Sequence, residues 1–157
     1  DRRQWRRGVY VHWQRQFLHP MMKAFDAPSR EECSASRPRS NTPTAALSLL
    51  NDPTFVEAAR VFAERLLSEW PADSRNERLT RAIEWALSRS PTEEEQVLLT
   101  DYFEKQSAAY KEDRKSALAL AGEGTFPRNE KLDPVEVAAW AGVTRTLLNL
   151  NETITKN

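Results

Sequence analysis

The sequence predicts an all-α fold, an irregular bundle of five to seven helices interrupted by an elbow rich in Pro and Ser. Only four of the 157 residues are Gly, while Ala, Leu, Glu and Arg, which favour helix, are abundant. Apolar residues recur at steps of three and four, and capping side chains precede several prolines. We expect one helical domain over residues 1–157, long enough to bury about 70% of its unfolded surface.

The first segment, residues 2–17, is expected to form an amphipathic helix. Trp5, Tyr10, Trp13 and Phe17 recur at roughly three- to four-residue steps among arginines. Such rings could stack on bases or sugars. The period of three to four residues favours an amphipathic helix that docks on a core, which is the preferred interpretation. The formal net charge is zero, so no overall field attracts nucleic acid. We expect no nucleic-acid partner.

Residues that could carry redox or nucleophilic chemistry are few. His12 and His19 are followed by two methionines, a set that suits haem or copper, but Pro20 interrupts helical geometry and no Cys-x-x-Cys-His motif is present. Cys33 is the only cysteine, and no histidine lies close to it in sequence. We therefore expect no catalytic residue, no metal and no cofactor in this chain.

Residues 25–43 form the elbow, an irregular segment between two helical ones. Loops that hold several charges in a fixed frame often carry binding sites. The preferred interpretation is structural, an Asp–Arg network that pins the segment, and a binding site is the alternative. The candidate residues are Asp26, Arg30, Arg37, Arg39, Asn41 and Thr42.

Helix starts are marked by capping chemistry. Three starts place a capping oxygen directly before a proline, the order expected at N-cap and N1. Two others have the capping-box spacing, Ser or Thr followed three residues later by Glu. Asn51 should end the helix before Asp52 in a left-handed conformation. The starts are Thr42-Pro43, Asp52-Pro53, Asp133-Pro134, Ser29…Glu32 and Thr92…Glu95.

The periodic segments follow these starts. Phe55, Ala59, Phe62, Leu66 and Trp70 build one apolar stripe from Pro53 onward. Weaker stripes cover residues 79–87 and 97–110. From residue 134 to about 150 apolar side chains cover so much of the circumference that this helix should be central. Residues 122–134 contain two Gly and two Pro without a period, which predicts a long loop.

Charge is distributed unevenly along the balanced chain. Residues 1–39 carry nine basic and four acidic side chains, which leaves fourteen basic and nineteen acidic ones for residues 40–157. We expect the two parts to attract one another or the rest of a longer chain. No run approaches the roughly 20 apolar residues of a membrane span, so none is expected.

Four blocks carry a family resemblance: "HPMMKAFDAPSREEC", "RPRSNTPTAALSLLNDPTFVEAARVFAERLL", "ALSRSPTEEE" and "WAGVTRTLLNLNETIT". In this order they resemble the C-terminal domain of large proteins abundant in planctomycetes, the domain-of-unknown-function family numbered 1553. The family pattern Asn-Thr-Pro-Leu-Gln-Ala-Leu is kept at Asn41, Thr42, Pro43, Ala46 and Leu47. This chain has Thr44 and Ala45 where Leu and Gln stand in that pattern.

The resemblance implies a multidomain, extracytoplasmic parent, periplasmic or secreted, because many members carry an N-terminal c-type cytochrome domain. The expected role is structural, a C-terminal helical domain that packs on the preceding domain of its own parent chain. As an alternative, the elbow contributes polar residues to a shared active site or polysaccharide-binding cleft. A third interpretation is docking of the cytochrome domain. The family has no established reaction, so none is carried over.

Overall fold

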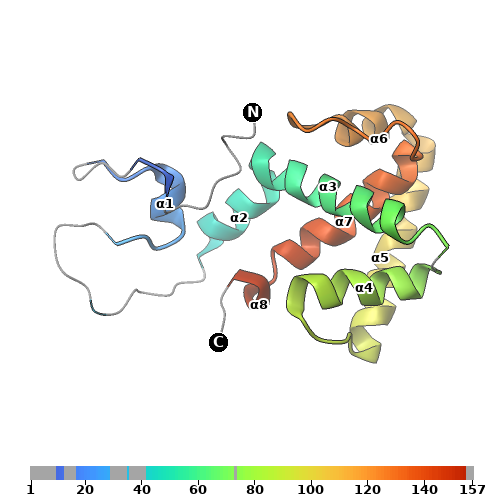
Figure 1. Ribbon diagram of the computed structural model, residues 1–157, viewed down its shortest axis with the longest axis horizontal. Coiled ribbons are helices and arrows are strands. Elements are labelled where there is room, and N and C mark those ends of the chain that lie inside the picture. The colour runs from blue at the N-terminus through green and yellow to red at the C-terminus, as the bar shows by residue number, and fades with distance from the viewer. Residues whose placement is uncertain (1–9, 13–16, 29–34, 36–41, 73, 155–157) are drawn as a thin grey trace. The chain divides into compact units, whose positions relative to one another are not determined.

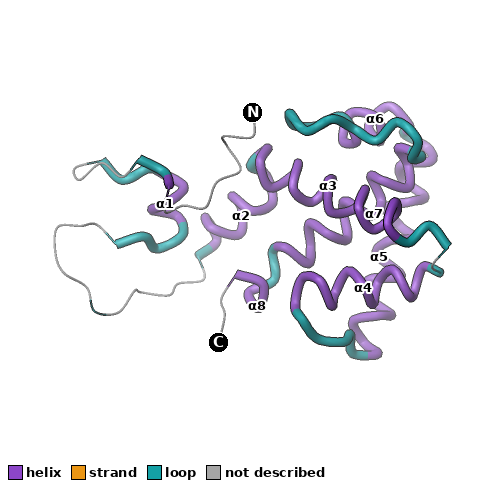
Figure 2. The backbone as a smooth tube through the Cα atoms, viewed as in Figure 1, coloured by secondary structure: helices purple, strands orange, loops and turns teal. Residues whose placement is uncertain are grey.

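The structure is a computed structural model that describes residues 10–12, 17–28, 35, 42–72 and 74–154. These residues form eight helices and no strand, which confirms the all-α class (Figure 1, Figure 2). The count exceeds the expected seven because two helices, α1 and α8, have five and four residues. The helices are α1 (Pro20–Ala24), α2 (Pro43–Asn51), α3 (Pro53–Glu69), α4 (Arg75–Leu87), α5 (Glu93–Glu112), α6 (Arg114–Ala121), α7 (Pro134–Leu148) and α8 (Asn151–Ile154).

The chain divides into two compact units, residues 1–48 and 49–157. In the first unit a continuous helix over residues 2–17 is wrong, because Val11, His12 and Phe17 are not helical. Val and aromatic side chains lose rotamer freedom in a helix, which disfavours one here. The helix begins instead at Pro20, and the Nδ1 atom of His19 accepts a hydrogen bond from the Met21 N–H at 3.3 Å.

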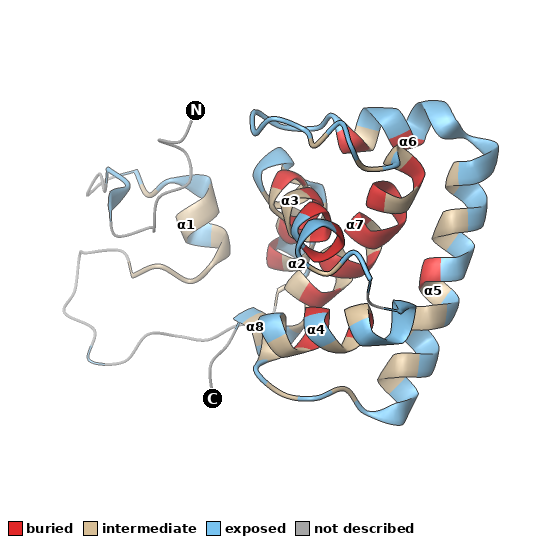
Figure 3. Ribbon diagram, turned by 45° about the vertical axis from the view of Figure 1, so that its right-hand side comes forward, coloured by how far each residue is buried: buried red, intermediate tan, exposed pale blue. Residues whose placement is uncertain are grey.

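The second unit is built around α7, as the sequence predicts. This helix contacts α3, α4, α5 and α6, and most of its length is buried (Figure 3). Trp140, at its middle, is 1% exposed and packs at a tilt against Phe103 of α5, with ring centroids 4.9 Å apart. Thr144 donates from Oγ1 to the Ala59 carbonyl at 2.8 Å, which ties α7 to α3. The central position therefore rests on apolar packing reinforced by a buried hydrogen bond.

Three of the predicted helix caps are confirmed. Asp52 accepts from the Thr54 N–H at 2.9 Å at the start of α3, with Pro53 in the first turn. Thr42 accepts from the Ala45 N–H at 3.2 Å at the start of α2. Thr92 forms a complete capping box at the start of α5. Capping residues and prolines thus locate these helix starts correctly.

Two predicted helix ends differ from expectation. Asp133 occupies the N-cap position of α7, but its side chain caps nothing, because Oδ1 accepts from Arg114 Nη2 at 3.0 Å. Asn51 is the last residue of α2, yet only Asp26 and Ser88 among the described non-Gly residues have positive φ. The left-handed end at Asn51 is therefore wrong. The helix stops because Asp52 precedes a proline and adopts an extended conformation.

Two further helix starts also carry capping residues in the sequence. Ser74 and Glu77 form a complete capping box at the start of α4. Asp113 separates α5 from α6 and accepts from the Ser116 N–H at 3.0 Å. Both show the three-residue spacing of a capping side chain and its partner.

Candidate functional site

Of the predicted elbow, the structure describes residues 25–28, 35, 42 and 43. Thr42 caps α2, and Asp26 adopts a left-handed conformation with φ of 55°. Arg30, Arg37, Arg39 and Asn41 lie outside the described residues, as does the capping box expected at Ser29 and Glu32. The Asp–Arg network and the alternative binding site both stay predictions.

A cluster of buried charges lies on α3, on the face turned toward the loop of residues 122–133. Glu57, Arg60 and Glu64 are 3%, 0% and 5% exposed. Arg60 donates from Nη1 to Glu64 Oε1 at 2.7 Å. It also donates from Nε to the Glu123 carbonyl at 3.0 Å and from Nη2 to the Phe126 carbonyl at 2.7 Å. The guanidinium thus holds one carboxylate and two loop carbonyls at once.

The two carboxylates hold the same loop by its N–H groups. Glu57 accepts a hydrogen bond from the Phe126 N–H, and Glu64 accepts one from the Asn129 N–H at 3.4 Å. Gly124 has φ of 94° and passes so close that a Cβ there would overlap the Glu57 side chain. The loop is therefore ordered by α3. The charged groups are engaged with backbone, so this cluster positions the loop and offers no free group to a ligand.

This cluster is not among the sites predicted from the sequence. Its signal is the spacing of three and four residues, which places Glu57, Arg60 and Glu64 on one helical face. A charged face of this kind is usually solvated, because buried Glu and Arg are rare unless paired. The partners that bury it lie more than sixty residues away in the chain.

An apolar groove of about 410 Å³ runs between α4, α5 and α7. Its walls are almost wholly hydrocarbon, and Leu98 is 67% exposed at its edge. Val97, the preceding residue, is 69% exposed but does not line the groove. The lining residues are Ile83, Glu95, Leu98, Leu99, Tyr102, Thr146, Leu147 and Leu150.

An ion cluster stands at the rim of this groove. Arg89 donates to both carboxylate oxygens of Glu95, at 2.7 and 2.8 Å, and to both of Glu152, at 2.8 and 2.9 Å. Hydrogen bonds from Arg89 lower the pKa of Glu95 to about 2 and also lower the pKa of Glu152. Bonding to the two carboxylates raises the pKa of Arg89. The cluster fixes α8 beside the start of α5 and leaves the groove walls apolar.

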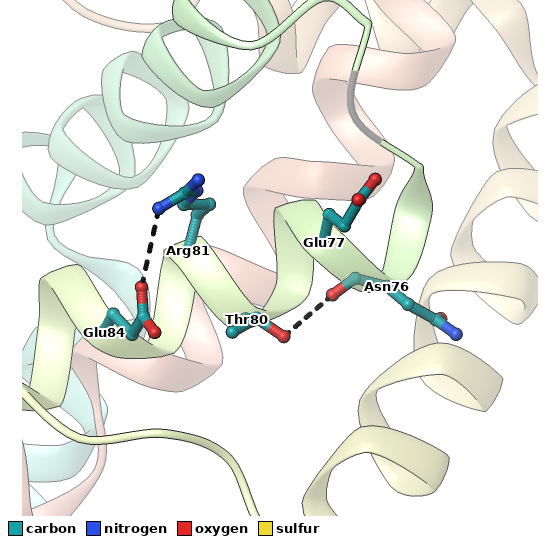
Figure 4. A pocket seen from close by; sticks show the side chains of 5 residues that line it. All are labelled: Asn76, Glu77, Thr80, Arg81 and Glu84. Atoms are coloured by element: carbon teal, nitrogen blue, oxygen red, sulfur yellow. Dashed lines mark hydrogen bonds and ion pairs between the residues drawn. The ribbon is translucent and has the colours of Figure 1, made fainter.

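A second, polar hollow of about 380 Å³ follows the exposed face of α4 (Figure 4). Thr80 donates from Oγ1 to the Asn76 carbonyl at 3.0 Å, and Arg81 lies 3.9 Å from Glu84. Glu77, the remaining lining residue, belongs to the capping box at the helix start. These polar groups are engaged along their own helix, an arrangement typical of a solvated helix face.

Aromatic rings join α3, and Trp70 at its end, to α4. Trp85 stacks on Phe62 with centroids 5.7 Å apart, and Trp70 meets it edge-on at 4.7 Å. Arg65 lies 4.6 Å above the Trp85 ring, and Arg81 lies 5.6 Å above Trp70. The half-exposed Trp85 is therefore part of a packed cluster, which stabilises the contact between the two helices.

These features define a helical-bundle domain whose polar side chains serve chiefly helix ends, loop anchoring and rim ion pairs. Within the described residues, no group of three His, Cys, Asp or Glu side chains is arranged to hold a metal ion. Among the same residues, no helix combines the length and apolar character needed to cross a membrane.

The family model described as "PSD1: Protein of unknown function (DUF1553)" matches residues 1–103. This range is more than half of the 157 residues, and the chain belongs to that family. The match ends inside α5, so the block quoted above from residues 140–155 lies beyond it. No curated protein and no solved structure matches the chain significantly.

Proposed function

We propose that this chain is a structural and interaction domain that packs on the preceding part of its own parent chain. The contact surface is the groove between α4, α5 and α7, and its occupant is an apolar segment flanked by basic side chains. The preceding part is the one implied by the family resemblance. The single observation that carries the proposal is the groove itself, an apolar hollow of about 410 Å³ with Leu98 exposed at its edge.

The apolar content of the groove supports a protein occupant. Leu98 and Leu99 of α5 line it together with Leu150, which follows α7. Contiguous exposed apolar surface commonly marks a contact. Burying apolar surface contributes about 25 cal/mol of favourable free energy per Å². A polar ligand would not provide this gain.

Charge supports a basic flank on that occupant. Glu93 and Glu94 are exposed in the first turn of α5, next to Glu95 of the groove lining. Residues 40–157 carry nineteen acidic against fourteen basic side chains. Complementary potentials steer association and fix its orientation more than they raise affinity.

The test compares Leu98→Asp with Val97→Asp in the full-length parent protein. The two positions are adjacent and equally exposed, but only Leu98 lines the groove. Leu98→Asp should uncouple this domain from the rest of the parent, so that calorimetry resolves a separate, lower-melting transition. Val97→Asp should leave the coupled transition unchanged, since it adds the same charge outside the groove.

Two outcomes would contradict the proposal. Equal effects of the two variants would show that the groove has no special role. A parent that is dimeric by light scattering and becomes monomeric with Leu98→Asp would instead assign the groove to a second copy.

The extracytoplasmic location, periplasmic or secreted, is part of this proposal and rests on the family resemblance. Cell fractionation of the parent tests it separately. The shared polysaccharide-binding cleft rests on the elbow, and of its six candidate residues the structure describes Asp26 and Thr42. The cytochrome-docking role rests on the family resemblance.

A further inference from the structure

A small, largely enclosed cavity of about 40 Å³ lies among α3, α5, α6 and α7. One water molecule requires about 10–15 Å³ of such volume, so the cavity accommodates a somewhat larger guest. Its polar lining consists of Tyr102, Gln106 and Tyr110 of α5 and Arg145 of α7. Gly142 completes it, where an added Cβ would stand 3.4 Å from the Tyr102 hydroxyl.

Arg145 brings a positive charge to this cavity. Its Nη2 atom donates to the Leu50 carbonyl in the last turn of α2 and lies 3.4 Å from Asn51 Oδ1. Its Nε atom is buried and has no hydrogen-bond partner. Within the described part of the chain no carboxylate pairs with this guanidinium. A buried N–H left unbonded is unfavourable, so Nε should have a partner that is not protein.

The three neutral side chains add further donors. Of the residues that the structure describes, none is hydrogen-bonded to the side chains of Tyr102, Gln106 or Tyr110. Burial raises the pKa of Tyr110, and the neighbouring Tyr102 adds to the rise. The Tyr110 hydroxyl is therefore protonated at neutral pH and can donate.

We propose that this cavity binds a small monovalent inorganic anion of the size of chloride. Such an ion accepts hydrogen bonds from Arg145 Nε, from the phenols and from the Gln106 amide together. It also balances the guanidinium charge, which a water molecule cannot do. A half-buried charge such as Arg145 is stabilised by an ion of opposite charge. The volume of about 40 Å³ favours a small ion over an organic carboxylate with its side chain.

The first test measures the melting temperature of the full chain at increasing concentrations of sodium chloride. A parallel series uses sodium gluconate at the same ionic strengths. An anion that binds only the folded state raises the melting temperature with its concentration. Chloride should produce a saturable rise, and gluconate, which is too large for the cavity, should produce none. Equal rises with both salts would overturn the proposal.

Matched variants locate the effect. Gln106→Leu removes one donor from the lining and should increase the half-saturating chloride concentration about tenfold. Gln96→Leu is the control, because Gln96 is also half-buried on α5 but does not line the cavity. Arg145→Gln should abolish the chloride response. If that variant does not fold, the comparison of Gln106→Leu with Gln96→Leu still decides the test.

A bromide soak provides the structural readout. Bromide replaces chloride and scatters anomalously, so a peak should appear within hydrogen-bond distance of Arg145 Nε. An empty anomalous map at the cavity, or identical chloride responses of Gln106→Leu and Gln96→Leu, would show that it holds only water.

Discussion

Arg60 and Glu64 lie one turn apart on α3 and share a hydrogen bond of 2.7 Å, although both side chains are buried. The same guanidinium also bonds two carbonyls of the loop of residues 122–133. An ion pair at this helical spacing normally contributes only a few tenths of a kcal/mol. Here it determines where a distant segment of the chain lies.

Arg60→Met is expected to lower the free energy of unfolding by about 3–5 kcal/mol, because it leaves Glu64 as an uncompensated buried charge. Arg65→Met is the control on the same helix, where the side chain is 58% exposed and pairs with Glu69. It should cost at most about 1 kcal/mol. Urea unfolding of both variants measures the difference, and similar losses would refute the anchoring role.

Gly124→Ala is expected to destabilise by more than about 1 kcal/mol, because φ is 94° and the new methyl group would overlap Glu57. Gly122→Ala is the matched control two residues earlier, where the nearest atom to an added Cβ is 3.4 Å away. It should be neutral or slightly stabilising. Thermal melts compare the two, and a tolerated Gly124→Ala would mean that the loop can move away from α3.

Asp52→Ala should cost about 1 kcal/mol, the usual effect of a lost N-cap, because Asp52 bonds the Thr54 N–H. Asp133→Ala should cost less, since Asp133 occupies the same position on α7 without a capping bond and only pairs with exposed Arg114. Melting temperatures of the two variants check this order. The reverse order would show that the Arg114 pair matters more than the Asp52 cap.

Glu95 should make stability depend on pH in acid. Its folded-state pKa is about 2 and its ordinary value 4.5, so the stabilisation is complete above about pH 4.5 and is lost as pH falls toward 2. Glu95→Gln should therefore show a shallower loss of stability over this window. Glu93→Gln, an exposed residue in the same helical turn, should follow the wild type. Urea unfolding at several pH values distinguishes them, and parallel curves for all three proteins would contradict the role of Arg89.

Local chemistry is what the sequence predicts well. The proline-marked starts at Asp52 and Thr42 follow from interactions within four residues, and they are correct. The central position of α7 follows from apolar side chains around its whole circumference. Asp133 fails as a cap because Arg114, nineteen residues earlier, competes for its carboxylate, and no local pattern contains that partner.

Long-range contacts account for the rest. Arg60 on a charged helical face looks solvated until the loop carbonyls of Glu123 and Phe126 are placed beside it. The apolar groove likewise joins residues of the neighbouring helices α4 and α5 to the end of α7, which lies far from them in sequence. The expected helix at residues 2–17 is wrong for a local reason. Its apolar period is helical, but Val11 and its aromatic neighbours have poor helix propensity.

The loop of residues 122–133 is held to α3 mainly by its main chain, through the carbonyls of Glu123 and Phe126 and the N–H groups of Phe126 and Asn129. Main-chain donors and acceptors are the same in every amino acid except proline, which has no N–H. Exposed positions such as Arg128 and Glu130 can therefore be exchanged without loosening the attachment. Relatives that keep the α3 charges and Gly124 are therefore free to vary this surface. New side chains introduced at these two positions should be displayed in a fixed conformation.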